Sequence, residues 1–274
     1  MPFCSGQPAM CEKSLVSKDL IDKWRKLDSF IDRLASIIEE DDEIKALLEM
    51  SNINAVKRLG YNDHGPVHAR IVAAASLEIL NLLLEKNIEL TTLKHGTTKS
   101  LEEVKLILVV ASYLHDIGNS IHREYHEALG SLLARDLADR IILRVYPDIG
   151  PRRFYIRQEI LSAIFSTEMN TKPLTLEASI VKLADGLDMS EGRARLPYKL
   201  GKMDMHSLSA LNVKRVKVTC DDVTPVVIEI YLGDMAGFFQ VEEVLLPKLE
   251  NSKLKGMVRI DIYSIEGRKV AAIT

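Results

Sequence analysis

Apolar residues recur at helical spacing through most of the first 210 residues of the chain. Apolar residues three or four positions apart lie on one face of an α-helix, so each such run predicts a helix. The runs cover residues 17–38, 44–50, 54–59, 65–84, 101–115, 124–145, 154–167 and 175–189. No strand pattern interrupts them, so this part is predicted to be all-α. Residues 1–16 are predicted to form a flexible tail.

The pattern changes after about residue 205. Val216, Val218 and Cys220 alternate with polar residues, and a period of two is typical of a half-buried β-strand. A second β-rich run follows over 225–232, and residues 236–249 then show helical spacing. Two further β-rich runs, 258–263 and 270–273, complete the chain. The sequence therefore predicts a mainly α protein. Its helical domain covers 17–205, and a small α/β domain of ββαββ order covers 206–274.

The segment Gly233–Phe238, between a predicted strand and a predicted helix, resembles part of the ligand-sensing ACT domain. That domain has a βαββαβ order, which this chain does not show. We therefore expect the small α/β domain to serve as an oligomerisation or lid domain, and oligomerisation would make the protein a homo-oligomer.

Composition places the 274-residue chain among ordinary globular proteins, with 47% hydrophobic and 27% charged residues. The net charge of −3 gives no general attraction to nucleic acid or to anionic membranes. No uninterrupted apolar run approaches the roughly 20 residues that a membrane helix needs, and Met1–Met10 lacks the features of a signal peptide. The three cysteines are few and widely scattered. We expect a cytoplasmic protein without a membrane partner, and the sequence gives no indication of a nucleic-acid partner.

One predicted helix ends in an unusual dipeptide. The run Val104–Leu114 is apolar except for Lys105 and Ser112, and it is followed directly by His115-Asp116. A helix that is apolar nearly all round is a buried helix. Burying an imidazole and a carboxylate at its end is costly unless they are paired. A hydrogen-bonded core network could compensate this cost, and so could a metal ion bound by both groups.

Other metal-competent residues accompany this pair. His64 and His68 begin one predicted helix, His122 and His126 lie near the start of another, and Asp185 lies within an apolar helix. Five of the seven histidines thus lie beside predicted helix ends between residues 64 and 126. Such a concentration favours a metal site over core histidines in an all-α scaffold, which would leave Asp116 and Asp185 unexplained.

In their order along the chain, these residues resemble the HD-domain phosphohydrolase superfamily. Its members carry a His, then a His-Asp pair, then a distant Asp, and all four bind a divalent metal within a helical bundle. The resemblance covers about residues 55–200 and implies His68, His115, Asp116 and Asp185 as the metal ligands. His68 is preferred over His64 as the first ligand because Val72 follows it by four residues, a common family spacing.

The resemblance also implies a catalytic pair, His64 and Asp116. Some members, including cyclic-nucleotide phosphodiesterases, carry a proton-donating His four residues before the first ligand, and His64 matches that position. A metal-bound water of lowered pKa would supply the nucleophile, and a nearby His can protonate the leaving group. The ligand types suit Mn, Fe, Ni, Mg or Zn without choosing among them.

Other residues could contribute to a second metal site or to phosphate binding. His122 and His126, with Arg123, could hold a second metal or contact phosphate. Members with two metals usually carry two more histidines before the final Asp, and the region 164–168 has none, so one metal is predicted. Asp188 could orient a ligand or simply end a helix. Basic residues that could bind phosphate are Arg193, Arg195, Lys199 and Lys202.

The sequence therefore predicts a metal-dependent phosphohydrolase that cleaves a phosphate ester of a nucleotide or similar small metabolite. The alternative is a non-enzymatic regulatory HD protein that senses a nucleotide or a metal and reports to the C-terminal domain.

Overall fold

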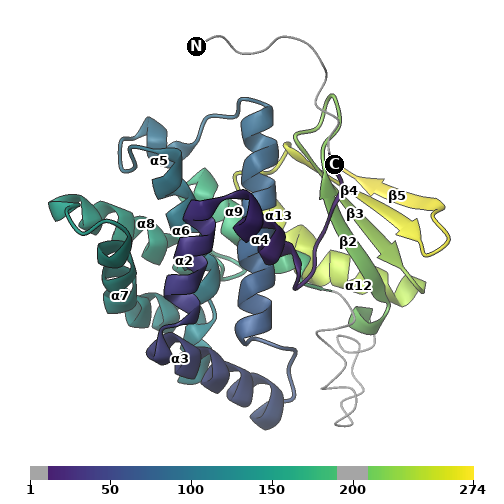
Figure 1. Cartoon of the computed structure of the whole chain (residues 1–274). Helices are drawn as coiled ribbons and strands as arrows, with labels where there is room; N and C mark the ends of the chain where they lie inside the picture. The colour runs from purple at the N-terminus through teal and green to yellow at the C-terminus, as the bar shows by residue number, and fades with distance from the viewer. Residues whose placement is uncertain (1–11, 190–208) are drawn as a thin grey trace.

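The computed structural model describes residues 12–189 and 209–274. A helical bundle comes first and a five-stranded mixed sheet with short helices follows it, as Figure 1 shows. The predicted fold class is confirmed. The helices of the bundle are α1 (Leu20–Leu27), α2 (Ser29–Glu39), α3 (Asp42–Asn52), η1 (Ile53–Arg58), α4 (Pro66–Glu85), α5 (Thr91–Lys94), α6 (Leu101–Leu114), η2 (Ile117–Ser120), α7 (His126–Val145), η3 (Gly150–Arg152), α8 (Arg153–Phe165) and α9 (Leu176–Leu187).

The single helix predicted over 17–38 is two helices in the structure, separated at Asp28. Asp28 has an extended backbone, and its side chain accepts hydrogen bonds from the backbone N–H groups of Phe30 and Ile31. This is the geometry of an N-cap, which satisfies amide groups that the first helical turn leaves unpaired. The apolar spacing continues across the break because both helices bury the same side, so periodicity alone did not reveal it.

Helix α4 is the central element of the bundle. Pro66 occupies its first turn, where a missing N–H costs nothing, and the helix packs against α6 and α9 on one side and against the sheet on the other. Figure 1 shows it between the other helices and the strands. By length and composition α4 could cross a membrane, but 78% of its most apolar window is buried inside the protein, as expected for a core helix.

The sheet has the order β1-β2-β3-β4-β5. Strands β3 and β4 are parallel and the other neighbours are antiparallel. A helical crossover joins β3 to β4, as parallel pairing requires. The strands are β1 (Ser14–Leu15), β2 (Val213–Thr219), β3 (Val226–Leu232), β4 (Val258–Ser264) and β5 (Lys269–Ile273), and the crossover contains η4 (Met235–Gly237), α12 (Phe238–Gln240), η5 (Val241–Leu245) and α13 (Leu246–Glu250).

Strand β1 corrects two sequence predictions. The segment before 17 was predicted to be a flexible tail, and no strand was predicted before about residue 210. Ser14 and Leu15 instead pair with Val218 and Lys217 of β2. Two residues are too few to show strand periodicity, and the pairing exists only because the distant β2 offers an open edge. The N-terminal segment therefore ties the bundle to the sheet.

The sheet and the bundle share one hydrophobic core. Buried residues of α4 and α9 and buried residues of the strands belong to the same contiguous cluster. Helix α9 also contacts η5 and α13 of the crossover. A Cβ on Gly186 of α9 would lie 3.2 Å from side-chain atoms of Leu245 and Lys248. The predicted boundary at residue 205 lies outside the described residues.

We expect a fragment ending at residue 208 to lose cooperative thermal unfolding and to aggregate. Removing β2 to β5 and the crossover would expose apolar surface of α4 and α9 that is buried in the whole chain. A shorter truncation after Ser264 removes β5, most of whose residues are exposed or half-buried, and should cost much less. Size-exclusion chromatography and thermal melting test this; a monodisperse fragment melting at the temperature of the full chain would contradict it.

Candidate metal centre

The four predicted metal ligands meet at one point, brought there by the ends of three helices. His68 lies in the first turn of α4, His115 and Asp116 follow the last turn of α6, and Asp185 lies in the last turns of α9. His68, His115 and Asp116 are almost fully buried. Two groups of metal-competent side chains result: His64, His68 and Asp116, and His68, His115 and Asp185.

Atoms that could bind a metal lie close together in five of the six pairs that these four side chains form. His68 Nε2 lies 3.2 Å from His115 Nε2, 3.4 Å from Asp116 Oδ2 and 3.1 Å from Asp185 Oδ1. His115 Nε2 lies 3.3 Å from the same Asp116 oxygen and 3.5 Å from the same Asp185 oxygen. Atoms about 2.1 Å from one metal ion lie about 3.0 Å apart in an octahedral site and about 3.4 Å apart in a tetrahedral one. The observed separations match these spacings.

Hydrogen bonds on the far side of each imidazole fix which nitrogen faces the centre. His115 Nδ1 donates to the Ser112 carbonyl at 2.8 Å, because a carbonyl oxygen can only accept. His68 Nδ1 lies 2.7 Å from Asp188 Oδ2. A carboxylate or carbonyl behind a metal-binding imidazole orients the ring and leaves Nε2 as the ligand. Of the two alternatives for Asp188, the structure favours the first, because its carboxylate orients His68.

The centre requires a cation. When both imidazoles donate from Nδ1, four hydrogen-bond acceptors face one another: two Nε2 lone pairs and two carboxylate oxygens. Burial lowers the pKa of His115, but the carboxylates of Asp116 and Asp185 outweigh burial and raise it to about 10. Burial raises the pKa of Asp116, yet His64 and His115 hold it well below its ordinary value. A proton on an imidazole can meet this demand, and a divalent metal meets it with the donor set that such ions prefer.

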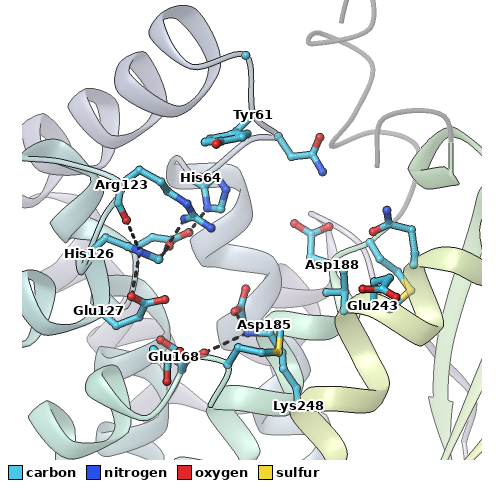
Figure 2. Close-up of a pocket in the computed structure, with 18 residues that line it drawn as sticks. Tyr61, His64, Arg123, His126, Glu127, Glu168, Asp185, Asp188, Glu243 and Lys248 are labelled. Atoms are coloured by element: carbon cyan, nitrogen blue, oxygen red, sulfur yellow. Dashed lines mark hydrogen bonds and ion pairs between the residues drawn. The ribbon is translucent and has the colours of Figure 1, made fainter. Parts of the chain in front are cut away.

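A cavity of about 480 Å³ opens onto this centre. Figure 2 shows Arg123, His126 and Glu127 on one side of it and Glu243 and Lys248 on the other. Lys182, fully buried in α9, donates to the backbone carbonyls of Glu168, Met169 and Thr171 and so fixes the loop that forms part of the wall. The lining residues are Gly60, Tyr61, Asn62, His64, Asp116, Arg123, His126, Glu127, Thr167, Glu168, Met169, Asp185, Asp188, Met189, Gln240, Glu243, Val244 and Lys248.

His64 lies at the edge of the centre. It precedes α4 and lines the cavity. Its Nδ1 lies 2.6 Å from Asp116 Oδ2, the oxygen that also faces His68 and His115. Because Asp116 is ionised, His64 Nδ1 donates this hydrogen bond. The contact joins the two residues predicted to be catalytic, and their roles stay predictions.

The structure places the other two candidate histidines, His122 and His126, in different surroundings. His126 Nε2 lies 3.4 Å from Asp116 Oδ1 and lines the cavity, whereas His122 is exposed and is not among the lining residues. The position of His126 depends on close packing between η2 and the start of α7. A Cβ on Gly118 would lie 1.9 Å from the backbone carbonyl oxygen of His126, so only glycine at position 118 permits this approach. Arg123 lies over the ring of Tyr61 at the cavity.

The remaining predicted phosphate contacts, Arg193, Arg195, Lys199 and Lys202, lie outside the described residues. Sequence reasoning missed Lys248, which reaches the centre from α13 of the C-terminal part. Its Nζ lies 2.6 Å from Asp185 Oδ2 and donates to the Thr167 carbonyl at 3.2 Å. No local signal marks Lys248, because it lies in an ordinary helical run 63 residues from Asp185.

Comparison with known proteins agrees with this site. The family model of the HD domain matches residues 68–190, a range that holds all four candidate ligands and Asp188. The chain is also 39% identical, over 221 residues, to the uncharacterized protein MJ1020 of Methanocaldococcus jannaschii, and the match covers 81% of this chain and 84% of that protein. No solved structure matches the chain. The protein belongs to the HD-domain family, and its buried His/Asp cluster has the composition of a metal site.

We expect the isolated protein to carry about one divalent ion per chain. Because the native state alone presents the converged ligands, adding the ion to metal-free protein should raise its thermal stability, by about 2.7 kcal/mol at a concentration 100 times Kd. Elemental analysis and melting curves with Mn, Fe, Ni, Zn and Mg test this.

His115→Ala should abolish both the bound ion and the thermal gain, because it removes one ligand. His122→Ala is the matched control and should retain both, because His122 is exposed outside the cavity. A wild-type protein without metal, and without a thermal gain from any of the five ions, would contradict the assignment.

Proposed function

We propose that this protein is a metal-dependent phosphohydrolase that cleaves a phosphate ester of a nucleotide or similar small metabolite. One observation supports this most directly: the buried cluster of His68, His115, Asp116 and Asp185 lies at a cavity that also contains His64. HD-domain proteins are typically phosphohydrolases. The cavity volume of about 480 Å³ is in the range of small-molecule sites.

Each residue of the centre has a distinct task in this proposal. His68, His115, Asp116 and Asp185 hold the ion, which when bound supplies a hydroxide near neutral pH and neutralises charge on phosphate oxygens. Asp188 and the Ser112 carbonyl keep the two imidazoles in the ligating orientation. His64 holds a proton at the cavity wall and gives it to the oxygen of the leaving group.

The proposal extends to partners and location. The partner is a phosphorylated small molecule, and neither membrane nor nucleic acid is required. We propose that the protein acts in the cytoplasm, and that the C-terminal sheet provides the surface for any homo-oligomer.

A panel of nucleotides and phosphate esters, assayed with each divalent ion, tests the reaction. Released phosphate indicates a phosphomonoesterase, and a new monoester product indicates a phosphodiesterase. Turnover should vanish in Asp185→Asn, which weakens one ligand, and should remain in the exposed control His122→Ala. Tight nucleotide or metal binding without any turnover would instead favour the regulatory alternative.

Substitution of the two neighbouring histidines separates ligand from proton donor. His68→Ala should lose both bound metal and turnover, because His68 lies among the converging ligand atoms. His64→Ala should keep the metal but lose roughly 10²–10⁴-fold in turnover, the usual effect of removing a general acid. Metal content and turnover number, measured on the same preparations, test this.

The loss in His64→Ala should shrink for nitrophenyl esters, because a nitrophenolate leaves without a proton. This comparison is the internal control for a proton-donor role. If His64→Ala emptied the metal site while His68→Ala kept it, the two roles would have to be exchanged. If both variants emptied it, His64 would also be a ligand.

A further inference from the structure

The C-terminal part of the chain contributes a positive charge to the candidate active site. Lys248 lies in α13, beyond the residues matched by the HD-domain model. Its side chain is only 8% exposed, yet it lines the cavity. The fold holds it firmly: Asn251, in the same segment, donates to the Met169 carbonyl, and the Lys253 backbone N–H donates to Ser179.

Lys248 and the metal centre share one carboxylate. Asp185 Oδ1 faces His68 and His115, whereas Oδ2 contacts the Lys248 ammonium at 2.6 Å. A buried ammonium needs a compensating negative charge. A divalent ion at Oδ1 would draw on the same carboxylate, so Lys248 would then be only partly compensated. An additional anion on the cavity side would restore the balance.

The hydrogen bonds of Lys248 leave capacity for such an anion. An ammonium has three N–H donors, and the described contacts use two, toward Asp185 and Thr167. Among the described lining residues, six are Asp or Glu, and the only Lys or Arg residues are Lys248 and Arg123. Arg123 donates to Asn119 and to His126 Nε2 and lies over the ring of Tyr61, whereas Lys248 contacts Asp185 directly. Of these two lining residues, Lys248 is therefore the one that directly contacts a candidate metal ligand.

We infer that Lys248 binds a phosphate oxygen of the substrate, so that the C-terminal domain completes the active site of the HD domain. This inference rests on the proposed phosphohydrolase function. A phosphate that contacts both the ion and Lys248 would be fixed from two sides, with one face directed toward the cavity. Lysine is a common point-charge binder of phosphate, and its ammonium is most effective where water is excluded.

Titration of manganese-loaded, full-length protein with inorganic phosphate tests the inference without requiring turnover. Lys248→Met keeps the length of the stem but removes the charge. It should weaken phosphate binding about 10- to 100-fold, the effect of one charge-assisted hydrogen bond. Lys248→Arg should retain most of the affinity. Lys255→Met, an exposed lysine paired with Glu250 and outside the cavity, is the matched control and should bind phosphate as wild type does.

Manganese affinity, measured in parallel, distinguishes phosphate binding from a purely positioning role. Removing a positive charge beside a cation site should not weaken manganese binding, so unchanged or tighter manganese binding supports the inference. A loss of manganese affinity that parallels the loss of phosphate affinity would show that Lys248 only positions Asp185, and would overturn it. Unchanged phosphate affinity in Lys248→Met would also overturn it while leaving the proposed function intact.

Failure of the proposed function has a different signature. Wild-type protein that binds manganese but neither binds phosphate nor turns over any ester would overturn both proposals. If Lys248→Met does not fold, as judged by its melting curve, Lys248→Gln carries the same expectation, because it keeps an N–H donor for the Thr167 carbonyl without the charge.

Discussion

The structure depends on two imidazoles and two carboxylates that lie close together and need positive charge among them, from a proton or from a metal ion. Two imidazole nitrogens and two carboxylate oxygens lie 3.1–3.5 Å apart in five of their six pairs. In an apolar core such an arrangement is costly unless positive charge accompanies it. Three helices end or begin at this point, and their apolar faces form the surrounding core. The four candidate ligands thus lie at or near helix ends, where the backbone can turn them inward.

Packing around the centre controls the orientation of each group. Asp188 and the Ser112 carbonyl fix the two imidazoles, and His64 and Asn119 hold the two oxygens of Asp116. Gly118 allows η2 and α7 to approach so closely that His126 reaches Asp116. Because these four partners are themselves buried, they restrict how the centre can rearrange. This preorganisation is what a metal site or a reaction centre requires.

The C-terminal domain is part of this arrangement. Strand β1 joins the sheet from the N-terminal segment, and α13 brings Lys248 to Asp185. The sheet and the bundle bury a common core. A separate, mobile lid would need a smaller and more polar interface. The structure instead favours a domain that supplies one wall of the cavity together with its charge.

Much of the fold and of the candidate site could be predicted from the sequence, because the relevant signals are local. Apolar spacing located most helices and all four C-terminal strands, and His115-Asp116 at the end of an apolar helix marked the centre. The spacing could not show the break at Asp28, because both helices bury the same side.

Only the tertiary structure decided which distant groups meet. It paired Ser14 and Leu15 with β2, placed His126 at the cavity and His122 outside it, and set Asp188 behind His68. It also brought Lys248 to Asp185 across 63 residues. Periodicity records which face of an element is buried, whereas such contacts depend on how the elements pack. The sequence by itself therefore determined the elements and the chemistry at their ends, and packing determined which of those groups share one site.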